Sequence, residues 1–136
     1  MPRILVVDDE PRLLKTTRLF LERAGHEVVT AGDLAGALRE LRPGRFDACL
    51  IDVLLPDGQG HDLLRLAPDM GCHLPIILMT GEPNAKGAAQ ASELRAFAYV
   101  AKPLTKQTLL TVVGEAVARG RQHADRAPVR QDGLLR

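Results

Sequence analysis

Five residues that can bind a metal ion or react with phosphate each follow an apolar segment of this sequence. They are Asp8, Asp9, Asp52, Thr80 and Lys102. A carboxylate that ends an apolar, buried-looking segment is costly unless it is paired, bound to a metal or modified. Asp52 ends four residues, 48–51, that look buried, so its charge in particular requires a chemical explanation.

The three carboxylates suggest a magnesium site with a nucleophile beside it. Carboxylates held within a few ångströms repel one another, and a divalent cation relieves that repulsion. Asp8, Asp9 and Asp52 offer only oxygen ligands, which favours Mg²⁺ over zinc. A carboxylate beside Mg²⁺ can attack phosphorus and become an aspartyl phosphate. Lys102 and the Thr80 hydroxyl are suited to neutralising charge on the transferred group.

The apolar segments have the pattern of strands that are buried on both faces of a parallel sheet. They are short, continuous and rich in β-branched residues, without polar alternation. The segment at residues 26–31 is more polar, which places it nearer a sheet edge. The predicted strands are residues 3–9, 26–31, 48–52, 75–81 and 97–103.

Segments with helical periodicity separate the predicted strands. Asp33 and Thr105 are placed to cap two of these helices. Pro68 is expected to stop another, because the residue before a proline avoids helical geometry. The predicted helices are residues 10–24, 34–41, 60–66, 84–94 and 105–119.

Strand and helix alternate five times, which predicts an α/β fold with a doubly wound parallel sheet and helices on both faces. Ligands of such sheets bind at the carboxyl ends of the strands. The five chemically capable residues are therefore expected to converge on one cleft, although they are distant in the sequence.

Length and charge limit the alternatives. We expect one domain at residues 1–119 and a linker or flexible tail at 120–136, where the apolar periodicity disappears. Eighteen Lys and Arg nearly balance 17 Asp and Glu, so charge does not favour nucleic acid or an anionic membrane as partner. No apolar segment has the length of a membrane span and no signal-peptide pattern is present, so a cytoplasmic location is expected. The four histidines have no matching ligand set and are expected to be solvated.

These motifs, in this order, resemble the receiver domain of bacterial two-component response regulators over about residues 3–119. The resemblance implies the flavodoxin-like strand order 2-1-3-4-5. It also implies a phosphorylation-dependent signalling switch that is a phosphoacceptor and not a classical enzyme.

The resemblance assigns roles to individual residues. Asp52 matches the phosphoacceptor, and the Mg²⁺ ligands would be Asp8, Asp9, Asp52 and the main-chain carbonyl of Leu54. Lys102 and Thr80 match the residues that act on the phosphoryl group. The remaining matches are Gly81 beside the switch hydroxyl, Tyr99 as the switch aromatic, and Pro103 after a cis peptide bond.

Two departures from the family pattern stand out. Receivers usually have glycine four residues before the switch aromatic, where this chain has Arg95, a residue that tolerates positive φ poorly. Pro68 would also make the third helix shorter than usual. Neither departure touches the phosphorylation chemistry.

The resemblance also implies partners. A histidine kinase or a histidine phosphotransfer protein would donate the phosphoryl group, and the surface of residues 84–94, 97–101 and 105–119 would repack for a partner, an attached output domain or a homodimer. We expect no direct binding of nucleic acid or membrane by this chain. The chain is either a stand-alone receiver or a piece of a longer regulator or hybrid kinase, and the linker-like tail favours the second.

Two other functions fit the sequence less well. An interaction module that signals without phosphate would be expected to lack an acid, the threonine or the lysine, and this chain has all of them. A phosphatase or dehalogenase with an aspartyl nucleophile usually needs a cap domain or further motifs, which this chain does not show.

Overall fold

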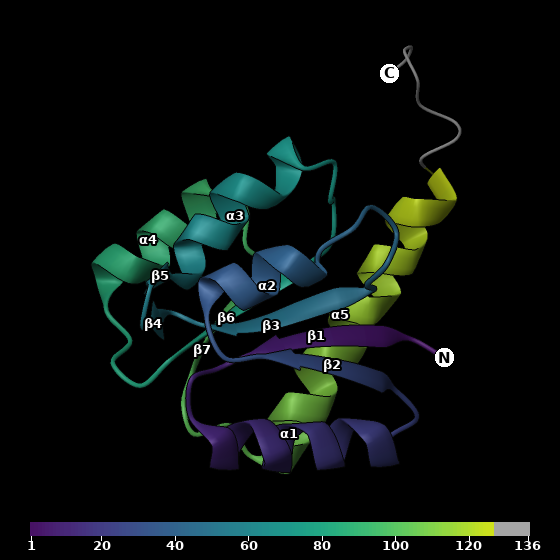
Figure 1. Cartoon of the computed structure of the whole chain (residues 1–136), viewed down its shortest axis with the longest axis horizontal. Helices are drawn as coiled ribbons and strands as arrows, with labels where there is room; N and C mark the ends of the chain where they lie inside the picture. Colours follow the sequence, from purple (N-terminus) through teal and green to yellow (C-terminus); the bar gives the residue numbers. More distant parts are fainter. Residues whose placement is uncertain (127–136) are drawn as a thin grey trace.

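The fold is a five-stranded parallel sheet covered by helices on both faces, and the computed structural model describes residues 1–126 (Figure 1). The strand order is β2-β1-β3-β6-β7, which is the predicted doubly wound order. The strands are β1 (Arg3–Val7), β2 (Glu27–Ala31), β3 (Ala48–Asp52), β6 (Ile76–Thr80) and β7 (Ala98–Ala101). A small antiparallel hairpin of β4 (Leu54–Leu55) and β5 (Gly58–Gln59) follows β3.

Five helices connect the strands. They are α1 (Pro11–Arg23), α2 (Leu34–Glu40), α3 (Gly60–Asp69), α4 (Ala85–Glu93) and α5 (Lys106–Arg126). Helices α2, α3 and α4 contribute to the core on one face of the sheet, and α1 and α5 to the core on the other (Figure 1). Asp33 caps α2 as predicted, with its carboxylate accepting from the Gly36 amide at 2.6 Å.

The central strands show why continuous apolar segments indicate a sheet covered on both faces. In β1, Leu5 and Val7 pack into the core on one side, while Ile4 and Val6 pack into the core on the other. Every residue of β3, including Asp52, is buried. Burial on both faces removes the polar alternation of a half-exposed strand.

The prediction that α3 stops before Pro68 is wrong, because the helix continues to Asp69. Pro68 lies on the exposed side of the last turn, where its ring meets little of the protein. The turn is completed by the Met70 amide, which donates to the carbonyls of Leu66 and Ala67 at 3.2 and 3.0 Å. The last turn of α3 is thus closed after Pro68, although the proline itself cannot donate a hydrogen bond.

Helix α5 also extends further than predicted, to Arg126 instead of residue 119. Gly120 allows a close approach, since a Cβ there would lie 2.6 Å from the Asp47 carbonyl oxygen. Arg121 Nε lies 3.7 Å from Asp47 Oδ1. These contacts support the helix beyond its last apolar repeat. The rest of the predicted tail, residues 127–136, lies outside the described residues.

Within residues 1–126, no helix is both long enough and apolar enough to cross a membrane.

Candidate functional site

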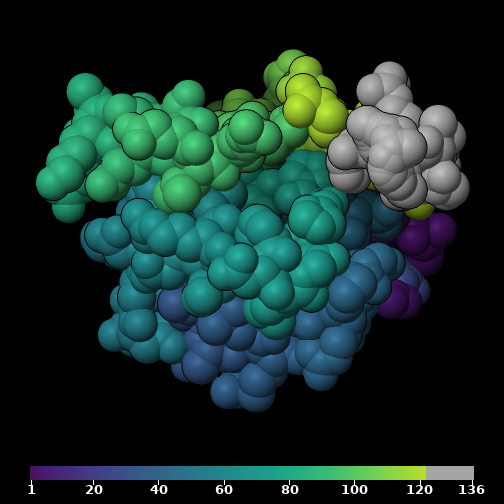
Figure 2. Space-filling model, turned by 90° about the horizontal axis from the view of Figure 1, so that it is seen from above, coloured from purple at the N-terminus to yellow at the C-terminus, as the bar shows by residue number. Residues whose placement is uncertain are grey.

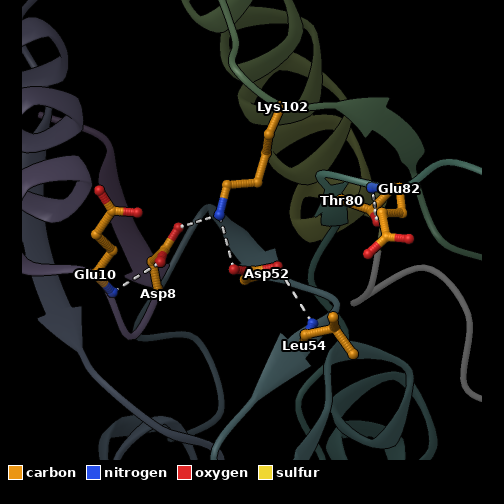
Figure 3. Close-up of polar contacts among 7 residues, drawn as sticks. All are labelled: Asp8, Glu10, Asp52, Leu54, Thr80, Glu82 and Lys102. Carbon is orange, nitrogen blue, oxygen red and sulfur yellow. Dashed lines mark hydrogen bonds and ion pairs between the residues drawn. The ribbon is translucent and has the colours of Figure 1, made fainter.

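The predicted residues meet at the carboxyl ends of four neighbouring strands (Figure 3). Asp8 follows β1, Asp52 ends the adjacent β3, and Thr80 ends β6 on the far side of β3. Lys102 follows β7 at the sheet edge and extends back over the centre (Figure 3). The convergence expected from the strand pattern is confirmed.

Lys102 joins the two buried carboxylates. Its Nζ donates to Asp52 Oδ2 at 2.8 Å and to Asp8 Oδ2 at 3.0 Å (Figure 3). Asp8 and Asp52 are 2% and 6% exposed, so water screens these charges poorly. The ion pairs compensate for much of the cost of burying two carboxylates.

The second oxygen of each carboxylate is held by the main chain. Asp8 Oδ1 accepts from the Glu10 amide at 3.0 Å, and Asp52 Oδ1 accepts from the Leu54 amide at 3.2 Å. Both side chains are thereby fixed in orientation before any ligand arrives. Such preorganisation is what positioning a reactive carboxylate requires.

Asp8, Asp9 and Asp52 together can hold a metal ion. One carboxylate oxygen from each lies within 4.8 Å of the others, and Asp9 is exposed while the other two are buried. Hard oxygen donors with one side open to solvent suit Mg²⁺, which keeps several of its waters. The acidic group therefore fits the divalent cation site that is typical of receiver domains.

The ionisation of Lys102 reflects both its burial and its partners. Burial lowers the pKa of the amine, but hydrogen bonds to Asp52 and Asp8 and the charges of both carboxylates outweigh this effect, so the pKa lies above its ordinary value. Lys102 is thus a fixed cation at neutral pH.

Thr80 is the buried hydroxyl of the site. It is 4% exposed, and its Oγ1 accepts from the Glu82 amide at 3.0 Å (Figure 3). Gly81 follows it, and apart from its two neighbours in the chain no described atom lies within 4 Å of the position that a Cβ would take there.

Tyr99 lies half-buried on β7, beneath the first turn of α4. Its hydroxyl accepts a long hydrogen bond of 3.4 Å from the Asn84 amide. A cavity of about 410 Å³ separates this ring from the site, and Thr80 and Tyr99 both line it.

Two backbone features follow the family pattern. The peptide bond between Lys102 and Pro103 is cis, as the resemblance implied. Arg95 has a φ of 64°, so the turn between α4 and β7 keeps left-handed geometry although glycine is absent. The surrounding fold imposes this conformation on a side chain that disfavours it.

The sequence analysis missed two residues near the site. His61, expected to be solvated, is only 2% exposed and its Nε2 lies 3.1 Å from the Gly87 carbonyl oxygen. Its place three residues before the buried Leu64 on one helix face is a signal that could have revealed this burial. Of the other histidines, His73 is exposed as expected. His26 is half-buried, and its Nδ1 is buried without a hydrogen-bond partner among the described residues, so it is not a fully solvated histidine. The side chain of His123 lies outside the described residues.

Asp57 is the second residue that was missed. Its carboxylate accepts from the Leu34 and Ala35 amides at 2.7 and 2.9 Å, and so caps α2 from the loop that follows β3. Hydrogen bonds from Ala35 and Leu34 lower the pKa of Asp57 below its ordinary value. No local pattern indicates this contact, because its partners are 22 and 23 residues away.

Comparisons with known proteins agree with this fold. The sequence model of the response regulator receiver domain matches residues 4–114. A receiver domain protein from Clostridium thermocellum has a similar structure, with a TM-score of 0.84 and 31% identity over 90% of this chain and 99% of that one. The non-phosphorylated HemR receiver domain of Leptospira biflexa gives a TM-score of 0.81 and 30% identity, over 87% of this chain and 95% of that one.

Curated relatives are longer proteins. NtrC of Bradyrhizobium sp. (strain RP501 Parasponia), a DNA-binding transcriptional regulator, is 34% identical over 119 residues, which are 88% of this chain and 25% of that protein. KdpE of Mycobacterium tuberculosis, a transcriptional regulatory protein, is 33% identical over 92% of this chain and 55% of its own length. The chain thus spans about a quarter of the first relative and about half of the second.

The family match places the chain among phosphoacceptor regulatory modules, which are not classical enzymes. The chain belongs to the response regulator receiver domain family of two-component signalling. Membership implies a cognate histidine kinase.

Proposed function

We propose that this chain is a phosphorylation-dependent switch in which Asp52 accepts a phosphoryl group from a histidine kinase or a histidine phosphotransfer protein. The observation that carries the proposal is the bridge from Lys102 to Asp52 and Asp8 at 2.8 and 3.0 Å, beside an acidic group that fits Mg²⁺. A cation fixed on the carboxylate that is to react is the arrangement that transfer of an anionic group requires.

In the proposed transfer, one carboxylate oxygen of Asp52 forms a bond to phosphorus while the bond from phosphorus to the donor's imidazole nitrogen breaks. The nitrogen keeps the electron pair and takes up a proton from solvent. Lys102 stays ionised and follows the phosphoryl oxygens. Asp8, Asp9, Asp52 and the main-chain carbonyl of Leu54 would hold Mg²⁺, which would neutralise charge on the transferring group.

The switch would then act through Thr80 and Tyr99. A phosphoryl group adds about 1.5 to 2 negative charges and strong acceptor oxygens. Thr80 would give up the hydrogen bond from the Glu82 amide and donate to the phosphoryl group instead. Tyr99 would turn inward into the cavity that both residues line. The surface of α4, β7 and α5 would repack as a result.

We propose this α4, β7 and α5 surface as the face that a partner, an attached output domain or a second copy reads. The two curated relatives are transcriptional regulators of which this chain covers only a part, which favours an output domain elsewhere in a longer protein. We do not propose that the receiver itself binds nucleic acid.

The test is incubation with Mg²⁺ and a small phosphodonor such as acetyl phosphate, followed by intact mass measurement. We expect a gain of one phosphoryl group that is labile to base and is lost in Asp52→Asn. Asp69→Asn, which changes an exposed acid at the end of α3, is the matched control and should keep the gain. Failure to gain mass under conditions that modify other receivers would contradict the proposal, as would a gain that persists in Asp52→Asn.

A further inference from the structure

His61 is a buried polar side chain that the proposed phosphorylation chemistry does not use. It lies in the first turn of α3, directly after Gly60, and is 2% exposed. Gly60 binds this turn to the strand end of Asp52, because its amide donates to the Val53 carbonyl at 2.9 Å and a Cβ there would lie 2.7 Å from the Asp52 carbonyl oxygen. The position of His61 is thus fixed relative to the phosphoacceptor backbone.

The imidazole of His61 reaches across to α4. Its Nε2 lies 3.1 Å from the Gly87 carbonyl oxygen, and since a carbonyl only accepts, Nε2 must carry the proton. The other nitrogen, Nδ1, is buried and has no hydrogen-bond partner in the part of the chain that the structure describes. The ring of His61 therefore makes one hydrogen bond, and that bond is to α4.

Gly87 connects three groups in the first turn of α4. Its amide donates to the capping side chain of Asn84 at 2.7 Å, and its carbonyl accepts from His61. A Cβ at this position would lie 2.5 Å from the Tyr99 hydroxyl, so only glycine lets the tyrosine lie so close. The histidine, the turn and the proposed switch tyrosine are therefore in one chain of contacts.

Apolar packing holds α4 weakly. Ala91 is its only buried residue, and the helix is rich in alanine with a glycine inside it. The contacts of the first turn therefore carry an unusually large share of its attachment. His61, Thr80 and Tyr99 also line the same cavity of about 410 Å³, into which Tyr99 would turn.

From this geometry we infer that His61 is a positioning residue which holds the first turn of α4 over Tyr99 in the resting state and so sets the resting bias of the switch. The inference rests on the proposed function, because it assumes that Tyr99 turns inward toward Thr80 on phosphorylation. When Tyr99 turns inward, it leaves Asn84 and Gly87. The hydrogen bond from His61 is then the polar contact that still opposes movement of α4.

The first test replaces His61 by leucine, which keeps an apolar side chain at the position but cannot donate. The chain has one tyrosine and no tryptophan, so its intrinsic fluorescence reports on Tyr99 alone. We expect the signal of unphosphorylated His61→Leu to move toward that of the wild type with beryllofluoride, a phosphoryl analogue. Amide exchange in residues 88–93 should become faster on the order of fivefold, the effect of losing one net hydrogen bond.

Two further variants separate positioning from general packing. His61→Gln can donate from about the same place and should restore both the wild-type fluorescence and the slow exchange. His73→Leu makes the same substitution at an exposed histidine and should change neither measurement. If His61→Leu matches the wild type in both measurements, or if His61→Gln behaves like His61→Leu, the inference is wrong.

A measurement on the wild type decides the question if His61→Leu does not fold. The nitrogen chemical shifts of the His61 ring, assigned with His61→Gln, should show the proton on Nε2 at rest and should change when beryllofluoride and Mg²⁺ are added. A ring that does not respond to these additions, in a protein whose Tyr99 fluorescence does respond, would overturn the inference.

The outcome is separable from that of the proposed function. Amide exchange of α4 in His61→Leu needs no phosphoryl group, so the contact can be confirmed even if Asp52 never accepts one. Conversely, a normal mass gain on Asp52 with unchanged α4 exchange in His61→Leu would leave the proposed function intact and remove the role of His61.

Discussion

The site has two halves that are built differently, one at the ends of β1 and β3 and one at β7 and α4. At the ends of β1 and β3, the last strand residues are buried, and the carboxylates of Asp8 and Asp52 are each held by two hydrogen bonds. At the other half, β7 is only partly buried, and α4 beside it has a single buried residue. The proposed chemistry thus lies where the structure is tightly packed, and the proposed movement lies where it is loosely packed.

The largest expected effect comes from a core substitution in the tightly packed half, at β3. Leu50 in β3 is fully buried, and Leu50→Ala should lower the free energy of unfolding by about 2 to 5 kcal/mol, because it leaves a cavity in the core. Leu94→Ala removes the same atoms from a partly buried leucine at the end of α4 and should cost only about 1 to 2 kcal/mol, because less of that side chain is buried. Urea unfolding of both variants measures the difference. Equal losses would show that the contrast between the halves is not energetic.

Lys102→Met tests the ionic centre of the tight half. Removing the cation leaves Asp8 and Asp52 buried without it, and we expect a loss of about 3 kcal/mol in the free energy of unfolding without Mg²⁺. Adding Mg²⁺ should recover part of the loss. Lys15→Met, at an exposed lysine of α1, is the matched control and should change stability little.

The difference in stability between the wild type and Lys102→Met should depend on pH. The pKa of Lys102 is raised, so its stabilisation is present in full below the ordinary lysine pKa of about 10.4 and is lost as pH rises through the higher pKa of the folded state. The difference in unfolding free energy between wild type and Lys102→Met should be constant at neutral pH and shrink in strong alkali. A difference that grows as pH rises from neutral into strong alkali would contradict this assignment.

Arg95→Gly sharpens the comparison in the loose half. Arg95 keeps a φ of 64°, which glycine adopts without strain, so the variant should be more stable by about 0.5 to 1 kcal/mol. Ser92→Gly introduces the same residue inside α4 and should destabilise by about 0.5 kcal/mol. Thermal unfolding measured for both should therefore move in opposite directions. A destabilised Arg95→Gly would mean that contacts of the arginine outweigh the strain.

Asp57→Asn should have the smallest effect, a decrease of about 1 °C in Tm at neutral pH, because an amide caps the α2 amides less well than a carboxylate. The pKa of Asp57 is lowered, so its contribution is present above the ordinary value of about 3.9 and is lost as pH falls through the folded value. The Tm difference should therefore disappear in acid. A difference that persists at low pH would show that charge is not its cause.

The sequence sufficed for the strands, most helices and the acidic site because each depends on a local pattern. Burial on both faces produces the continuous apolar segments, and residues that follow such segments in a parallel sheet must meet at one edge. Asp8, Asp52 and Lys102 could therefore be placed together without any structure.

The features that the sequence did not reveal depend on contacts between distant segments. Gly120 extends α5 because Asp47 lies beside it, and Asp57 caps a helix that precedes it by more than 20 residues. Pro68 is tolerated because its side of the last turn of α3 faces solvent. A periodic pattern reports which face is buried, but it does not identify the partner.

The bridge of Lys102 has a consequence for how the protein is made. Lys102 is 94 residues from Asp8 and 50 from Asp52, so contacts that depend on it form only when the first and last strands of the chain are both in place. Contacts between residues so far apart form late in folding, because they require the closure of long loops. A chain still emerging from the ribosome therefore has Asp8 and Asp52 long before it has the lysine that completes the site.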